Sequence, residues 1–163
     1  MGKKINILFA PSNTASMPDI TLQALNRRSD INAKGISLGS TMYWSFGENW
    51  KIIELSSLRK HPFKRIGQYL SYKFAIAKGI LWADILMWHW DIDTFEYYLI
   101  KLLRKPIFVE WIGSDIRVPE IVFRENHYYK DAWENGDWDY KMESMERSNR
   151  IQKKFYQLKA MPT

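Results

Sequence analysis

The sequence has no cysteine among its 163 residues. Disulfide bonds and metal sites ligated by cysteine are therefore excluded. Long hydrophobic runs are also lacking. The first apolar segment covers only residues 5–10, and the most apolar later segment, residues 80–90, is interrupted by Asp84. The first is too short for a secretory signal and the second too short to span a bilayer. We therefore expect a soluble, cytoplasmic chain that is not exported.

Two phosphate-binding motifs are missing as well. No Gly-x-Gly-x-x-Gly pattern follows the first apolar segment, and the glycines and Lys-Ser/Thr pair of a P-loop are absent. What is present is a large apolar fraction, 46% of the residues, with eight Trp and nine Tyr. A chain of this length and composition forms one domain with a substantial core. Its net charge of +6 is too modest to choose between nucleic acid, an anionic membrane and phosphorylated ligands.

Acidic residues are scarce in the middle of the chain. Glu54 is the only acid within a basic cluster formed by Lys51, Arg59, Lys60, Lys64, Arg65, Lys73 and Lys78. Such a cluster is usually a solvated face. The alternative is contact with anionic lipid or with a lipid-phosphate acceptor. No recognisable nucleic-acid-binding module accompanies the cluster, so nucleic acid is not an expected partner.

Strand and helix patterns alternate along the first two thirds of the chain. The predicted strands cover residues 4–10, 31–38, 51–55, 83–88 and 107–111, and the predicted helices begin at Pro18, Pro62 and Asp93. Apolar residues at helical spacing mark the second helix (Ile66, Leu70, Phe74, Ala77) and the third (Phe95, Leu99, Leu102). Asp93 and Glu96 form a capping-box pattern. The alternation predicts an α/β fold, a single doubly wound, Rossmann-like parallel sheet with helices on both faces.

The last part of the chain has a different character. Residues 124–163 are highly charged, and Trp133, Trp138 and Tyr140 are interleaved with acids and amides. A helix is predicted over residues 141–158. We therefore expect a Rossmann-like domain over residues 1–123 and a helical extension over 124–163. The three aromatic residues either fold back onto the core or form an exposed patch for a partner.

The first candidate site is the loop after the first strand, where Ser12 and Asn13 precede a helix N-terminus. Because ligands bind beyond the carboxyl ends of parallel strands, these side chains can bond a sugar or a phosphate. An ordinary strand-to-helix turn with a capping residue is an equally good interpretation.

The second candidate is the segment Trp88-His89-Trp90-Asp91, in which His89 lies at the end of a strand beside two large aromatic residues and an acid. Its imidazole can act as a general base or bind a phosphate, and the tryptophans can stack on a sugar. From spacing alone, a core histidine bonded to a backbone carbonyl is the better interpretation.

The third candidate is the loop after the strand at 107–111, with Gly113, Ser114, Asp115 and Arg117. Asp115 can accept a hydrogen bond from a substrate hydroxyl or act as a base, and Arg117 can bind a phosphate. Helix capping by Ser114 or Asp115, with an ion pair to Arg117, explains the same residues equally well.

Two segments carry a resemblance to a known family. Residues 83–90 read ADILMWHW and residues 105–117 read KPIFVEWIGSDIR. In their order and spacing they resemble the acceptor-side, N-terminal domain of GT-B glycosyltransferases, family 4 in particular. The resemblance covers residues 1–123. The sequence departs from the family pattern in two places. Ile112 stands where the family often has His, and the loop after the first strand lacks paired glycines.

The resemblance implies a two-domain enzyme whose site lies between the domains. This chain then binds a sugar or lipid-linked acceptor and no cofactor of its own, and metal-free, retaining transfer is the family norm. The nucleotide-sugar donor is expected on a C-terminal domain or partner chain that the sequence does not include, so this chain alone is expected to be inactive. By the resemblance, His89 corresponds to a cleft residue near the transferred sugar, and Asp115, with Gly113 and Ser114, belongs to the other cleft-facing loop. We therefore expect His89 and Asp115 to be catalytic. Together with the local chemistry of the loops, Ser12, Asn13, Gly113, Ser114 and Arg117 are expected to bind substrate. The alternative is a non-catalytic module of the same fold that binds a partner or the inner membrane face.

Overall fold

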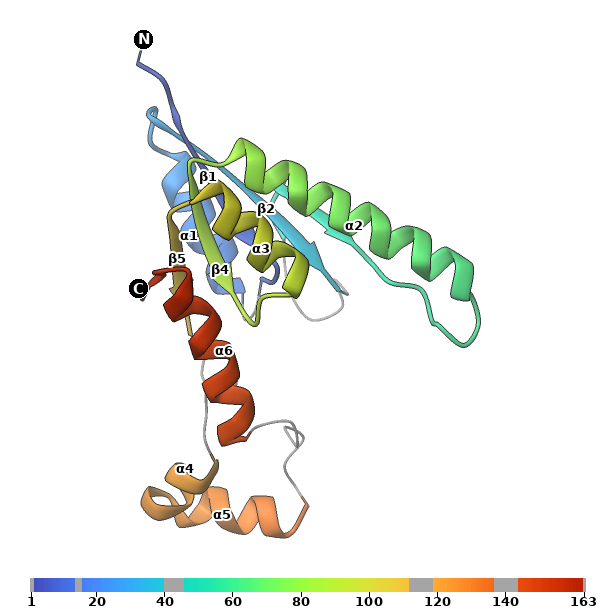
Figure 1. Ribbon diagram of the computed structural model, residues 1–163, viewed down its shortest axis with the longest axis vertical. Helices are drawn as coiled ribbons and strands as arrows, with labels where there is room; N and C mark the ends of the chain where they lie inside the picture. Colours follow the sequence, from blue (N-terminus) through green and yellow to red (C-terminus); the bar gives the residue numbers. More distant parts are fainter. Residues whose placement is uncertain (1, 14–15, 40–45, 112–118, 137–143, 163) are drawn as a thin grey trace.

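A computed structural model describes residues 2–13, 16–39, 46–111, 119–136 and 144–162 (Figure 1). Its centre is a single sheet of six parallel strands in the order β3-β2-β1-β4-β5-β6. The strands are β1 (Ile5–Ala10), β2 (Ile31–Leu38), β3 (Trp50–Ile53), β4 (Ile85–His89), β5 (Ile107–Glu110) and β6 (Met161–Pro162). The chain reverses its direction of winding between β1 and β4. This is the Rossmann-like α/β fold that the alternation predicts.

Helices cover both faces of the sheet. On one face α1 (Met17–Asn26) packs through Leu22 against the apolar side chains of β1 and β2. On the other face lie α2 (Pro62–Trp82), α3 (Thr94–Leu103) and α6 (Met145–Gln157), which enclose the larger core with Trp88 and Ile107. The helices on opposite faces follow from right-handed crossovers in the two winding directions.

The bounds of α2 agree with the prediction, but its buried face does not include the residues that mark the helix in the sequence. Its buried side chains are Tyr72, Ala75, Ile76 and Ile80. The apolar series that indicates the helix is largely solvent-exposed, with Ile66 53%, Leu70 61% and Phe74 64% accessible. The same holds in α3, where Phe95 and Leu102 are exposed while Tyr97 and Ile100 are buried. Each helix therefore has a second apolar face that the domain does not cover.

Asp93 occupies the N-cap of α3, as predicted, but the capping box is wrong. The Asp93 side chain makes no capping hydrogen bond. Its carboxylate and that of Glu96 bind the ammonium group of Lys73 on α2 instead. A cation from a neighbouring helix has displaced the local pattern, because a charged donor makes a stronger hydrogen bond than a backbone N–H.

The final third of the chain divides into two parts. The helices α4 (Pro119–Glu125) and α5 (His127–Glu134) lie away from the sheet in Figure 1. There Trp133 contacts Phe123 and Tyr129, with ring centroids 5.8 and 6.3 Å apart. The predicted tail helix is α6, which buries Ile151 and Phe155 in the core of the sheet. Trp138 and Tyr140 lie outside the described residues.

Gly35 shows why a glycine interrupts β2. A Cβ atom at this position would lie only 2.2 to 2.5 Å from carbons of the Trp50 indole. The indole lies flat against the β2 backbone and donates from Nε1 to the Asp19 carboxylate at 2.8 Å. Asp19, on α1, also accepts from the Gly47 backbone and from Gln23. The buried carboxylate of Asp19 thus joins α1 to the start of β3 and to the loop before it.

Candidate functional site

A cavity of about 460 Å³ opens where the winding direction reverses, beyond the carboxyl ends of β1 and β4. We call it the switch-point cavity. Its described lining residues are Pro11, Ser12, Leu38, Tyr72, Trp88, Trp90, Asp91, Asp93 and Glu96. In open parallel sheets this is the position at which ligands bind.

Two tryptophans from the end of β4 form the apolar wall of the cavity. Trp88 is 1% exposed and fixed by a hydrogen bond from Nε1 to the Asp91 carbonyl at 3.2 Å. Trp90 has a backbone φ of 99°, a strained value for a bulky side chain. The Arg147 guanidinium of α6 lies 5.3 Å from the centre of its ring. Strain of this kind is concentrated at functional sites and is maintained by surrounding contacts.

Three carboxylates face the same cavity, and each lies near a lysine. Lys73 Nζ lies 2.6 Å from Asp93 and 2.7 Å from Glu96, which is 1% exposed. Lys154 Nζ lies 2.9 Å from Asp91. The hydrogen bond from Lys73 holds the pKa of the Asp93 carboxyl below its usual range. Burial alone would lower the pKa of Lys73, but the hydrogen bonds that its ammonium group donates to Asp93 and Glu96 raise it above its ordinary value. Asp93 and Lys73 are therefore both charged at neutral pH.

Tyr72 completes the polar lining from α2. Burial raises the pKa of its hydroxyl above its ordinary value, and the charges of Glu96 and Asp93 act in the same direction. The phenol is therefore neutral and can donate a hydrogen bond.

The chemistry of this lining favours an uncharged ligand with several hydroxyl groups. The described lining residues include three carboxylates and two hydroxyls but no lysine or arginine. Carboxylate oxygens accept from ligand hydroxyls but offer a phosphate no hydrogen-bond donor, and Lys73 and Lys154 are already paired with them. The indole faces provide apolar surface for the C–H groups of a ring. A sugar fits this combination better than a phosphate does.

The structure separates the predicted site residues of the first loop. Ser12 lines the cavity. Asn13 is buried, and its side-chain oxygen accepts from the Asp19 backbone N–H at 2.9 Å near the start of α1. Asn13 thus has the role of an ordinary turn residue, whereas ligand binding by Ser12 stays a prediction.

His89 does not belong to the described lining of the cavity. Because side chains alternate along β4, Trp88 faces α2 and α3 while His89 faces the side of α1. The imidazole is fully buried and stacks on Phe9, with ring centroids 5.9 Å apart. Its Nδ1 lies 3.2 Å from Glu110 Oε2, but neither ring nitrogen makes a hydrogen bond within the described residues. Burial lowers the pKa of His89 to about 4, so the ring is neutral at pH 7.

The other predicted site residues, Gly113, Ser114, Asp115 and Arg117, lie outside the described residues. Asp91 belongs to the second candidate segment and lines the cavity, but three other lining residues were not predicted, namely Tyr72, Asp93 and Glu96. The only available signal for the last two was their position just after β4, and their spacing suggested a helix cap instead. Among the described residues there is no group of three or more His, Cys, Asp or Glu side chains placed to hold a metal ion.

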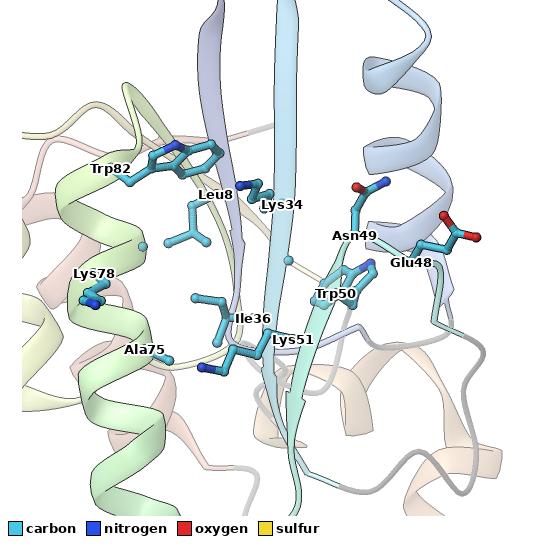
Figure 2. Close-up of a pocket in the computed structure, with 12 residues that line it drawn as sticks. Leu8, Lys34, Ile36, Glu48, Asn49, Trp50, Lys51, Ala75, Lys78 and Trp82 are labelled. Carbon is cyan, nitrogen blue, oxygen red and sulfur yellow. The ribbon is translucent and has the colours of Figure 1, made fainter.

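A second cavity, of about 440 Å³, lies between α2 and the edge of the sheet (Figure 2). Lys34 from β2, Lys51 from β3 and Lys78 from α2 surround it, with Trp82 at one end. It lies beside the start of the edge strand β3, away from the carboxyl ends of the strands. The switch-point cavity is therefore the better candidate for a functional site.

Neither protein-family models nor curated proteins gave a match to this chain. None of the helices in the described part of the chain is both long and apolar enough to cross a bilayer.

Proposed function

We propose that this chain is the acceptor-side domain of a sugar-nucleotide-dependent glycosyltransferase. The observation that carries the proposal is the switch-point cavity, with two tryptophans and three carboxylates at the carboxyl ends of β1 and β4. The resemblance of residues 83–90 and 105–117 to GT-B enzymes supports the same assignment. The acceptor is then a glycan, a glycolipid or a small glycoside.

In this proposal the cavity orients an acceptor sugar. Trp90 packs against a sugar face, and Asp91 and Ser12 bond its hydroxyl groups. Asp93 and Glu96 are held in place by Lys73, so that they accept hydrogen bonds without moving. Fixing the acceptor in this way lowers the entropic cost of reaching the donor.

The resemblance assigns cleft roles to His89 and Asp115, and the buried position of His89 defines what its role can be. A fully buried imidazole that stacks on Phe9 supports the ends of β1, β4 and β5 without contacting the cavity. His89 is therefore proposed as a positioning residue. Asp115 is proposed as the residue that contacts the reacting sugar. The donor nucleotide is proposed to bind a separate domain or chain.

Saturation-transfer NMR on this chain tests the proposal directly. The probes are the methyl glycosides of glucose, galactose, mannose and N-acetylglucosamine at millimolar concentration. We expect transfer to the ring protons of at least one glycoside, reduced in Trp90→Ala and Asp91→Asn. Trp133→Ala is the matched control, because Trp133 lies on α5 away from the cavity, and it should leave transfer unchanged. Absence of transfer to every glycoside would contradict the proposal.

The alternative is a non-catalytic module of the same fold that binds a partner or a membrane. The exposed apolar faces of α2 and α3 favour it. A module of this kind needs no sugar site. Sugar binding that is lost in Trp90→Ala would therefore argue against a purely non-catalytic module.

In a protein that combines this chain with a donor-binding half, the proposal predicts that His89→Ala and Asp115→Ala lower transfer without unfolding this domain. Asp115→Ala should reduce kcat with little change in stability. His89→Ala should also lower the thermal midpoint, because it removes a buried, stacked ring. Normal transfer rates in both variants would contradict the assignment.

A further inference from the structure

The helix α2 has an apolar stripe on the side that faces away from the sheet. The stripe consists of Phe63, Ile66, Leu70, Phe74 and Leu81, which are between 53% and 87% exposed. The helix has 21 residues, so the stripe extends along most of its length of roughly 30 Å. Five large apolar side chains in a line on one helix are more than the scattered exposure usual for a soluble surface.

The apolar surface continues onto the neighbouring helix α3. Phe95, Tyr98 and Leu102 are 48%, 62% and 79% exposed there. Lys73 of α2 lies 5.9 Å from the centre of the Phe95 ring, so that the two helices meet at this surface. Next to the stripe is an apolar hollow of about 470 Å³, which Leu55, Leu58 and Ile66 help to line. The stripe, the exposed residues of α3 and this hollow together form the α2–α3 surface.

Basic residues predominate around this surface. There is no Asp or Glu in residues 55–83, whereas Arg59, Lys60, Lys64 and Lys78 are exposed at the stripe or just before it. Lys101 and Arg104 are exposed at the end of α3. The two acids on the α3 side, Asp93 and Glu96, are bound to Lys73.

These features are those of a helix that lies in the plane of an anionic bilayer. Such a helix inserts an apolar face among the lipids while flanking lysines and arginines contact the phosphates. A second copy of the chain fits less well, because packing stripe against stripe would bring the basic rims together. The charge pattern is thus complementary to a lipid surface and not to itself.

We propose that the α2–α3 surface docks on a membrane that contains anionic lipids. The inference does not depend on the proposed sugar-binding function. It has one consequence for that function. Leu38 lines both the apolar hollow and the switch-point cavity, so docking would place the cavity next to the lipid headgroups.

Vesicle co-sedimentation of the full chain tests the proposal. The vesicles consist of phosphatidylcholine alone or of phosphatidylcholine and phosphatidylglycerol in equal amounts. We expect binding to the mixed vesicles only, with most of it lost in 1 M salt, where the Debye length is about 3 Å. The double variant Leu70→Ser/Phe74→Ser should bind at least about tenfold more weakly, since two inserted side chains are lost. The double variant Lys64→Glu/Lys78→Glu should be weakened by a similar factor.

Matched controls come from the opposite face of the domain. Ile20 on α1 is 61% exposed and Arg27 is exposed at the end of the same helix. Ile20→Ser and Arg27→Glu should leave vesicle binding unchanged. Circular dichroism of each variant verifies the fold, which surface substitutions should preserve.

Three results would overturn the proposal. One is failure of the unaltered chain to bind the mixed vesicles. Another is equal binding by both double variants and the controls. The third is a dimer in solution that Leu70→Ser/Phe74→Ser dissociates, which would make the stripe an interface between copies of the chain.

Discussion

Protonation of His89 should destabilise the fold at mildly acidic pH. The imidazole is fully buried, and burial lowers its pKa from the ordinary 6.5 to about 4. Between these two values the unfolded chain binds a proton that the folded chain does not. Stability from this group is therefore complete above pH 6.5 and is lost as the pH falls toward 4. The difference corresponds to about 3 kcal/mol in total, of which about 2 kcal/mol is lost by pH 5. The Glu110 carboxylate, 3.2 Å from Nδ1, opposes the loss, so these are upper values.

Urea unfolding between about pH 7 and pH 5 measures this effect. His89→Phe keeps a ring that can stack on Phe9 but removes both nitrogens. We expect this variant to lose most of the pH dependence in that range. His61→Gln is the matched control, because His61 is exposed, and it should retain the slope of the unaltered chain. The reasoning is refuted if His89→Phe and the unaltered chain lose the same free energy of unfolding over this range.

Three further predictions concern stability and are measured as urea midpoints. Gly35→Ala should destabilise by at least about 1–3 kcal/mol because its Cβ overlaps Trp50, whereas Gly67→Ala, with open space on exposed α2, should stabilise by about 0.5–1 kcal/mol. Equal effects would argue against the Trp50 packing. Asp19→Ala should cost about 2–4 kcal/mol by leaving buried donors unpaired, and a neutral result would refute this. Lys73→Met should lower the free energy of unfolding by about 3–5 kcal/mol, because it leaves the buried Glu96 carboxylate without its partner. The double variant Lys73→Met/Glu96→Gln should recover much of this loss. A loss of less than about 1 kcal/mol in Lys73→Met would contradict the importance of the pair.

Most of the fold could be predicted from the sequence because its elements are marked by strong local patterns. The five predicted strands correspond to β1 to β5, and α2 covers the predicted residues. The short helices α4 and α5 were not predicted. Phe123 of α4 packs against Tyr129 and Trp133 of α5, and these aromatic residues lie among charged residues in the sequence.

The buried face of α2 could not be predicted, because two series of residues have helical spacing. Leu70 and Phe74 form one series, and Ile76 and Ile80 form the other. Spacing defines the faces of a helix, but only the position of the sheet determines which face is buried. Because the exposed series contains the larger side chains, the sequence pattern wrongly favours it as the buried face.

The candidate site could be predicted only in part. The rule that ligands bind beyond the carboxyl ends of strands selects two loops that border the switch-point cavity, and Ser12 and the two tryptophans line it. The alternation of side chains along β4 could also have placed His89 on the opposite face from Trp88. The pairing of Asp93 and Glu96 with Lys73 could not be foreseen, since it joins residues 20 and 23 positions apart in the sequence.

The central claim is that the switch-point cavity binds a sugar, and a titration of the tryptophan indole N–H resonances tests it most directly. Methyl glycosides are added to the labelled chain, and the shifts of Trp88, Trp90, Trp82 and Trp133 are followed. We predict that Trp90 shifts with saturation while Trp133 on α5 and Trp82 at the second cavity do not move. Shifts confined to Trp82, or no shift with any glycoside, would contradict the claim.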